Sequence, residues 1–305
     1  MTTHMQKAAR VALTGANGMV GSALTTFLTG KGITVVRIVR ESSRATNNDI
    51  VWNPSAGTLD ASVLEGLDSV IHLAGEPIAE RWSETKKAAI RQSRVDGTSL
   101  LAKRLAELAS PPRVLVSASA MGIYGDRGDE ILTEESAPGR DFLASVAREW
   151  EGAADAARAA GIRVAHPRFG IILSASGGAL AKMLPPFKLG AGGKLGPGSQ
   201  WWSWIAMQDV LSGIALLLEN EELDGPINFV SPNPVRNAEF TDTLGHVLSR
   251  PTVASVPAFA LRLLFGEMAD ATLLASQRVA PKRLEAAGFR FEYPVLEKAL
   301  RVAVE

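Results

Sequence analysis

The chain has 305 residues, 46% of them hydrophobic, so it is long enough for two domains or for one large α/β domain with an appended part. Its 32 basic and 32 acidic residues cancel, which removes any overall electrostatic attraction to nucleic acid or to an anionic membrane. The absence of cysteine excludes disulfides, thiolate metal sites and a cysteine nucleophile, and the four histidines show no metal-ligand spacing. Because there is no signal peptide pattern and no apolar run of roughly 20 residues, we expect a soluble, cytoplasmic protein without a metal that acts on a small molecule.

The first predicted element is a strand at residues 10–14, which runs into Thr14-Gly15-Ala16-Asn17-Gly18-Met19-Val20-Gly21 and then into a helix. A strand that ends in glycines and turns at once into a helix directs free backbone N–H groups at a pyrophosphate. Gly15 permits the tight turn, Gly18 lets the backbone approach the phosphates, and Gly21 lets the helix pack against the strand. The alternative is a glycine-rich turn that holds no ligand. The residues predicted to contact the dinucleotide here are Gly15, Ala16, Asn17, Gly18, Met19 and Val20.

The first half of the chain alternates short β-branched runs with longer helical patterns, which is typical of a parallel sheet with helices on both faces. We therefore predict an α/β fold with a Rossmann-like doubly wound parallel sheet. A helix at 84–108 ends before Pro111-Pro112, which cannot continue it, and a helix at 141–160 ends at Gly161. Further strands are predicted near residues 33–39, 49–52, 69–73, 113–117 and 163–172.

Beyond Leu173 the pattern changes, and five of the ten residues from Leu189 to Gly198 are glycine. A helix at 207–218 and an apolar run at 227–230 repeat the earlier rhythm, and Asn237 is expected to cap a further helix. The predicted domains are an NADP-binding domain at 1–172, with about 205–233 packing back onto it, and a smaller, mostly helical substrate and C-terminal domain at 173–305.

The end of the second strand carries the information on cofactor choice. It ends at Arg40, with Arg44 four residues on and two serines between them, which suits a 2′-phosphate better than two free ribose hydroxyls. A charge-assisted bond from arginine to phosphate contributes about 1.5 to 3 kcal/mol, or about a ten- to hundredfold preference for NADP over NAD. The alternative is that Arg40 is only a solvated strand end.

Several motifs together resemble the extended short-chain dehydrogenase/reductase superfamily, in its NAD-dependent epimerase/dehydratase branch. A closer resemblance is to an atypical subgroup of that branch, which ends in a small C-terminal domain of unknown function. It implies that Leu73, Ala74, Gly75 and Ser117 lie beside the cofactor, and that the chain passes the nicotinamide at Pro167-Arg168. The motifs are the glycine run, His72-Leu73-Ala74-Gly75-Glu76-Pro77-Ile78, Asp96-Gly97-Thr98, Ser117-Ala118-Ser119, Tyr124-Gly125, Asp141-Phe142-Leu143-Ala144, Trp150-Glu151, Ser203-Trp204-Ile205, Arg250-Pro251 and Ala287-Gly288-Phe289.

The usual proton relay of that superfamily is missing. The resemblance places Leu143 where a catalytic tyrosine is expected and Ala147 where a lysine follows it, and neither side chain can transfer a proton. Neither tyrosine of the chain, Tyr124 or Tyr293, has a lysine four residues later. Of the usual catalytic groups only the serine, Ser119, remains, and a serine at a strand end is also a common turn former.

The remaining candidates for proton transfer are Ser119, Tyr124, Glu76 and water. Tyr124 would be a poor base near neutral pH without a lysine to lower its pKa of about 10, and Glu76 alternatively caps a loop. Arg168 either binds an anionic group or pairs with the acidic loop 126–135, and we favour the ion pair.

Three tryptophans follow the glycine-rich loop: Trp201, Trp202 and Trp204 wall a substrate pocket, or they seal a joint between domains or a dimer contact. We predict an NADP(H)-binding atypical oxidoreductase that acts on an unidentified small substrate. The resemblance to the superfamily, whose long helices often pair, implies a homodimer. The alternative is a non-catalytic NADP(H)-binding sensor or interaction module. Sugar-nucleotide epimerisation by the standard route is disfavoured because the tyrosine and lysine are absent.

Overall fold

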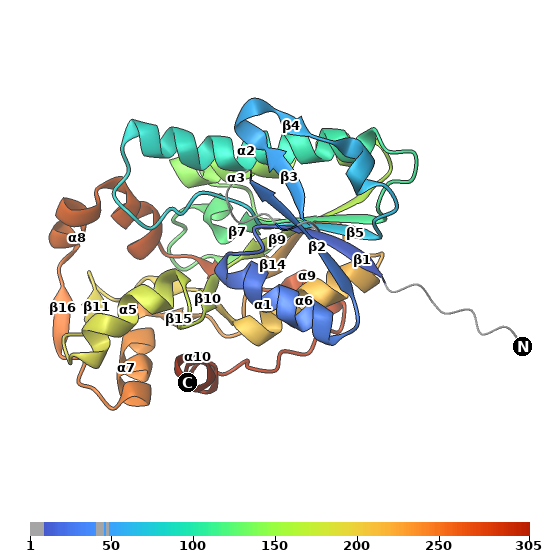
Figure 1. The fold of residues 1–305 in the computed structure, drawn as a ribbon. Coiled ribbons are helices and arrows are strands. Elements are labelled where there is room, and N and C mark those ends of the chain that lie inside the picture. Colours follow the sequence, from blue (N-terminus) through green and yellow to red (C-terminus); the bar gives the residue numbers. More distant parts are fainter. Residues whose placement is uncertain (1–8, 41–45, 47–48) are drawn as a thin grey trace, which may run out of the picture.

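The structure, a computed structural model, describes residues 9–40, 46 and 49–305, and a sheet of nine strands lies at the centre of this part (Figure 1). Its strands are β1 (Arg10–Thr14), β2 (Thr34–Arg40), β3 (Ile50–Asn53), β4 (Thr58–Leu59), β5 (Ser69–His72), β6 (Val114–Ser117), β7 (Ser119–Ala120), β9 (Arg163–Phe169) and β14 (Gly225–Phe229). They are ordered β14-β9-β6-β5-β1-β2-β3-β4, with β7 paired to β9. Every pairing is parallel except that of β3 with β4.

Both faces of this sheet are covered by helices (Figure 1). Along β1, Val11 and Leu13 pack into one core cluster while Ala12 packs into the cluster on the opposite face. Because both faces are buried, the strands appear in the sequence as nearly continuous apolar runs. The predicted doubly wound parallel fold is confirmed. The first face is covered by α1 (Met19–Gly30) and α6 (Met207–Glu219), and the second by α2 (Glu84–Ala106), α3 (Phe142–Gly152) and α4 (Asp155–Ala159).

A second group of elements lies beyond the carboxyl ends of the strands, on the left of Figure 1. Its core cluster includes Trp204, Phe240 and Leu300, which are completely buried. The helices are α5 (Gly178–Lys188), α7 (Asn237–Leu248), α8 (Ala258–Phe265) and α10 (Leu296–Val304). A further short helix, α9 (Lys282–Ala286), packs instead on the first face of the sheet, against β14. Short strands pair as β8 (Ile131–Leu132) with β17 (Arg278–Val279), β10 (Ile171–Leu173) with β13 (Trp204–Ala206), β11 (Gly193–Leu195) with β16 (Ala254–Val256), and β12 (Trp201–Trp202) with β15 (Val235–Arg236).

Short turns of tighter or wider helix complete the described chain: η1 (Pro54–Ala56), η2 (Ala61–Leu64) and η3 (Met121–Tyr124) are 3₁₀ turns, and η4 (Ala269–Leu273) is a π-helical turn. The chain returns to the large sheet through α6 and β14, as the sequence pattern indicated, and Ile227 pairs with Pro167 of β9. Among the described helices, none combines the length and the hydropathy that a bilayer crossing requires.

Three predicted elements differ from the structure. The helix expected at 141–160 is divided into α3 and α4 after Gly152, a residue with low helix propensity. The strand expected at 163–172 breaks at Gly170, because the chain there changes its pairing partner from β14 to β13. A Cβ on Gly170 would lie 2.7 Å from the Ser203 carbonyl oxygen. Asn237 does not cap its helix. It is the first residue of α7, and its Oδ1 accepts a hydrogen bond from the Leu195 N–H at 2.8 Å.

One helix was not predicted at all. α5 contains Pro185 and Pro186, which normally argue against a helix because proline lacks the N–H donor. Leu180, Leu184 and Phe187 form its buried side, so tertiary packing outweighs the local propensity.

Candidate functional site

The strand order itself marks a binding crevice. β1 and β5 are neighbours in the sheet, but the chain leaves them in opposite directions: from β1 it continues to β2, and from β5 it continues to β6 on the other side. In open α/β sheets, ligands bind outside the carboxyl ends of the strands at such a reversal. The loop 15–18 lies at this position, between β1 and α1.

The glycine loop is packed too closely to admit side chains. Gly15 has φ +71°, and a Cβ built on it would lie 2.8 Å from the carbonyl carbon of Leu73 and 2.9 Å from the Ala74 nitrogen. A Cβ on Gly21 would lie 2.1 Å from the Gly15 carbonyl oxygen. The first turn of α1 is therefore held directly against the end of β1 and the chain that follows β5.

The start of α1 offers unpaired donors. Gly18 is the N-cap residue, no side chain caps the helix, and the first turn carries no acidic residue. The backbone N–H groups of Met19, Val20 and Gly21 therefore lack intrahelical acceptors, as the first N–H groups of any helix do. Ala16 is buried and Asn17 is exposed in the loop before them. The exposed end of this loop and the start of α1 thus have the chemistry of an anion site, with the buried Ala16 behind them.

Thr14 ties this loop to β5, a link that the sequence analysis did not identify. Its Oγ1 accepts hydrogen bonds from the N–H groups of Leu73 at 3.1 Å and Ala74 at 3.2 Å, and lies 2.7 Å from His72 Nδ1. Leu73 and Ala74 are therefore fixed next to the glycine loop, and Gly75 follows them directly.

The residues predicted to choose between cofactors lie at the end of β2. Arg40 is the last residue of that strand and is exposed. Arg44, Ser42 and Ser43 lie outside the described residues.

Ser119 belongs to a buried charged network. Its Oγ donates to Glu151 Oε1 at 2.7 Å, and Arg168 donates to both oxygens of the same carboxylate, from Nε and Nη2, at 2.8 Å each. Arg168 is 6% exposed, so this pair is shielded from solvent. The acidic loop 126–135 is therefore not the partner of Arg168, because Glu151 on α3 lies closer.

Glu151 was not among the predicted site residues, although its spacing was informative. Leu143, Ala147 and Glu151 are four residues apart, so they follow one side of α3. Burial acts to raise the pKa of Glu151, but the hydrogen bonds and charge of Arg168 outweigh it and lower the pKa. The pKa of Arg168 is raised because Glu151 outweighs its burial. Both groups are ionised at neutral pH.

Tyr124 does not reach an open site, contrary to the prediction. It is fully buried, its Oη accepts from Arg168 Nη1 at 2.9 Å, and it donates to Asn228 Oδ1 at 2.6 Å. Burial raises the pKa of the phenol above its usual value, against the opposing effect of Arg168. Both hydrogen-bonding capacities of the hydroxyl are used inside the protein, so Tyr124 has a structural position.

Two further predicted contacts, Ser117 and Pro167, are also buried within the sheet. Glu76, in contrast, lies at the carboxyl edge after Gly75, and its Oε1 accepts from Lys86 Nζ at 2.8 Å. Leu143 lies next to Gly122, and Ala147 is buried. Both side chains are apolar, so these two positions provide no substitute for the missing tyrosine and lysine.

The three tryptophans do not wall an open pocket. Trp204 is completely buried and Trp202 is 4% exposed, and the Trp202 ring packs edge-on against Phe240 in the core of the second group of elements. The ring of Trp201 is contacted by the guanidinium groups of Arg236 and Arg278, 4.2 and 4.5 Å from its centroid. Their packing corresponds to the alternative prediction, a seal inside the molecule.

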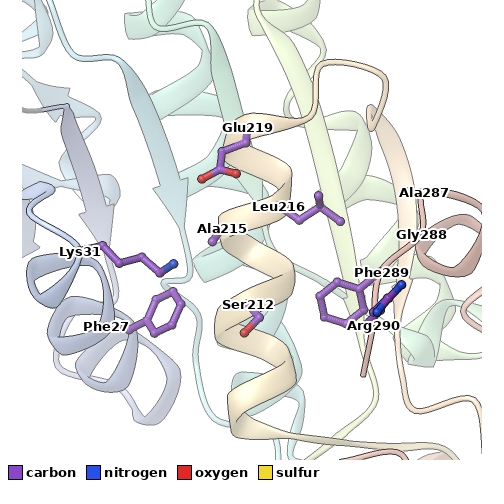
Figure 2. A pocket seen from close by; sticks show the side chains of 10 residues that line it. All are labelled: Phe27, Lys31, Ser212, Ala215, Leu216, Glu219, Ala287, Gly288, Phe289 and Arg290. Atoms are coloured by element: carbon purple, nitrogen blue, oxygen red, sulfur yellow. The ribbon is translucent and has the colours of Figure 1, made fainter. Parts of the chain in front are cut away.

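Hollows occur elsewhere on the surface. Figure 2 shows one of about 350 Å³, with Phe27 and Lys31 on one side and Phe289 and Arg290 on the other. It is formed at the ends of α1 and α6, so it lies at the sheet edge opposite the glycine loop. A second, of about 550 Å³, lies between the segments 124–127 and 137–141. In the part of the chain that the structure describes, no three His, Asp or Glu residues are grouped as a metal site.

Comparison with known proteins adds to this geometry. The NAD dependent epimerase/dehydratase family matches residues 11–230, and a domain of unknown function, DUF1731, matches residues 256–303. An epimerase family protein of Mycobacterium bovis is 40% identical over 294 residues, which cover 96% of this chain and 97% of that protein. An Arabidopsis thaliana protein named as a chloroplastic SDR39U1 homolog is 39% identical over 303 residues, covering 97% and 86%. The crystal structure of human epimerase family protein SDR39U1 (isoform 2) with NADPH has a TM-score of 0.86 at 31% identity, covering 96% of this chain and 98% of that one.

Proposed function

This chain belongs to the NAD-dependent epimerase/dehydratase family, and from that premise we propose that it binds NADP(H) and acts as an atypical oxidoreductase on a small substrate. The observation that carries the proposal is the glycine loop, whose Gly15 and Gly21 leave no room for a Cβ and which presents uncapped N–H groups. The human relative whose structure was solved with NADPH supports the choice of cofactor.

In this proposal, residues 15–20 hold the pyrophosphate through backbone N–H groups, and Leu73, Ala74 and Gly75 line the same crevice. Arg40 binds the 2′-phosphate, since it is a cation and is exposed at the carboxyl end of β2. The cofactor, when bound, supplies a hydride donor or acceptor. The chain contributes position and orientation, which alone can accelerate a transfer between two bound reactants.

The source of the proton differs from that in the wider superfamily, because Leu143 and Ala147 cannot supply it. Ser119 is held by the ionised Glu151, and Glu76 lies at the crevice edge in an ion pair with Lys86. We propose that Ser119 is a positioning residue behind the site and that the proton comes from Glu76 or from water.

A second candidate function is supported by one specific observation. Ser119, Tyr124 and Glu151 are buried and already satisfied by hydrogen bonds inside the protein. This arrangement also suits a non-catalytic NADP(H)-binding sensor or interaction module.

The cofactor assignment is tested by titrating NADPH and NADH into the protein while its tryptophan fluorescence is measured. Arg40→Asp removes the cation from the 2′-phosphate, so the preference for NADPH should fall by about ten- to hundredfold. Arg113→Asp is the matched control, because Arg113 is exposed at the opposite ends of the strands. Unchanged selectivity in Arg40→Asp contradicts the assignment.

The two functions are separated by following NADPH absorbance with a panel of aldehydes, ketones and quinones. Turnover by the wild type identifies an oxidoreductase, and the Ser119→Ala variant then shows how far positioning by Ser119 contributes. NADPH binding without turnover of any member of the panel identifies the sensor or module.

A further inference from the structure

Arg94, on α2, was not among the predicted site residues, yet its guanidinium lies at the crevice. A Cβ built on Gly75 would be 3.4 Å from Arg94 Cζ and 3.5 Å from Nη2, so the group lies against the third residue after the end of β5. Its Cζ also lies 5.0 Å from the centroid of the Trp150 ring. The guanidinium thus contacts both an aromatic ring and a backbone segment of the candidate cofactor site.

Only part of the hydrogen-bonding capacity of Arg94 is used. Nη1 donates to the carbonyl oxygens of Glu76 at 3.0 Å and Ile90 at 3.1 Å, while Nε and Nη2 have no acceptor among the described residues. Nor does any described carboxylate come within ion-pair distance of the group. Other cations on the same helix do have a carboxylate partner: Lys86 pairs with Glu76, Lys87 with Glu267, and Arg91 with Glu149.

The Arg94 side chain is half-buried, so its guanidinium has lost part of its hydration without gaining a carboxylate partner among the described residues. Burial lowers the pKa of Arg94 to about 10, and Glu76 opposes this shift only in part. Because this pKa is still well above neutral pH, the group remains charged. Removing a charge from water is repaid only by a partner of opposite charge with good hydrogen-bond geometry.

The position of Arg94 separates it from the parts of the site proposed for the cofactor phosphates. The uncapped start of α1 provides the pyrophosphate donors, and Arg40 lies at the end of β2, on the opposite side of β1 from β5. Arg94 lies over the chain that follows β5, on the same side of β1 as β9, where the family resemblance places the nicotinamide.

We infer that Arg94 binds an anionic group of the substrate, a carboxylate or a phosphoryl group, through Nε and Nη2. This inference rests on the proposed function, since it assumes that the substrate lies in the same crevice as NADP(H). It narrows the substrate class to small organic acids and phosphorylated carbonyl compounds.

The test uses protein saturated with NADPH and calorimetric titration with oxalate and with inorganic phosphate, each compared with neutral oxamide. Arg94→Met keeps an apolar side chain on Trp150 but removes the charge, Arg94→Lys keeps the charge, and Arg91→Met is a control on the same helix. We expect the wild type and Arg91→Met to bind at least one anion equally well. Arg94→Met should bind that anion about ten- to hundredfold more weakly, with Arg94→Lys between them and oxamide not bound.

Equal anion binding by Arg94→Met and the wild type overturns the inference, as does a wild type that binds neither anion. A loss of NADPH affinity in Arg94→Met without any change in anion binding also overturns it, because the guanidinium then serves the cofactor. Failure of the proposed function appears separately, as a wild type that does not bind NADPH. The same titrations without NADPH then test Arg94 by itself. Thermal melts of each variant establish that it is folded.

Discussion

Glu151 is the residue on which the buried charges of the site depend. One carboxylate accepts hydrogen bonds from Ser119 and from two nitrogens of Arg168, and Arg168 continues the network to Tyr124. On the same side of α3, Ala147 and Leu143 lie one and two turns before Glu151, and both are apolar. Glu151 is therefore the polar group on that side of the helix. Buried pairs of this kind are costly to break from one side because a bare charge is left behind.

We therefore predict strong coupling between Glu151 and Arg168 in a double-mutant cycle. Glu151→Leu and Arg168→Met should each lower the free energy of unfolding by about 3–5 kcal/mol, since each leaves the other charge unpaired. The double variant should be much less destabilised than the sum of the two, because it removes both charges together. Urea denaturation followed by circular dichroism measures all four proteins, and additive losses would contradict the role of the pair.

For single residues, the sequence predicted identities better than surroundings. Ser119 was found from its motif, and the absence of a tyrosine–lysine pair was visible directly. The sequence did not show that Tyr124 is buried or that Arg168 pairs with Glu151. Both depend on which side chains from α3 and β14 meet β9 in space. The four-residue spacing from Ala147 to Glu151 was the signal that could have identified Glu151 as a residue on the same side of the helix.

The contact between α1 and the glycine loop is the element that positions the proposed cofactor. It depends on two close approaches, that of Gly15 to the chain after β5 and that of Gly21 to the Gly15 carbonyl. A side chain at either point would push the helix start away from the strands and re-aim its N–H groups.

The expected result of this packing is a large difference between two glycines of the same helix. Gly21→Ala places a Cβ 2.1 Å from a carbonyl oxygen, so it should cost about 1–3 kcal/mol of stability and weaken NADPH binding strongly. Gly30→Ala is the matched control, because a Cβ added there meets no atom within 4 Å, and it should be neutral or stabilising by up to about 1 kcal/mol. Denaturation and NADPH titration of both variants check this, and equal effects would show that the close approach is unimportant.

Element boundaries followed from the sequence wherever one periodicity was uninterrupted. β1, α2 and α6 lie within a few residues of their predicted ranges, because strong apolar patterns and Pro111-Pro112 mark them. The break at Gly170 and the helix through Pro185 and Pro186 were missed, since contacts with distant parts of the chain decide both.

The histidines buried in the sheet couple the stability of the whole molecule to pH. His72 is completely buried against Trp52 and Thr14, and burial lowers its pKa from 6.5 to about 4. Between these two values the unfolded chain binds a proton that the folded protein does not. Folding is therefore favoured less as the pH falls through this window.

We expect the free energy of unfolding to decrease by about 3 kcal/mol on account of His72 between pH 6.5 and pH 4. His72→Asn should flatten the slope in this range, whatever its effect at pH 7. His246→Asn is the control, because His246 is exposed on α7. Denaturation midpoints measured across the range test this, and identical slopes in the wild type and His72→Asn would contradict it.

Local patterns along the chain were enough to establish the doubly wound parallel sheet, the family and the glycine loop, because periodicity, glycine spacing and turn chemistry act over short stretches. Which of the marked side chains are open to a ligand depended on the folded arrangement. Folding buried Tyr124, Trp202 and Trp204, and it paired Arg168 with Glu151. It also placed the charged Arg94 next to Gly75, with no carboxylate partner among the described residues. Burial and pairing depend on residues far apart in the chain, and a pattern read along the sequence does not contain those distances.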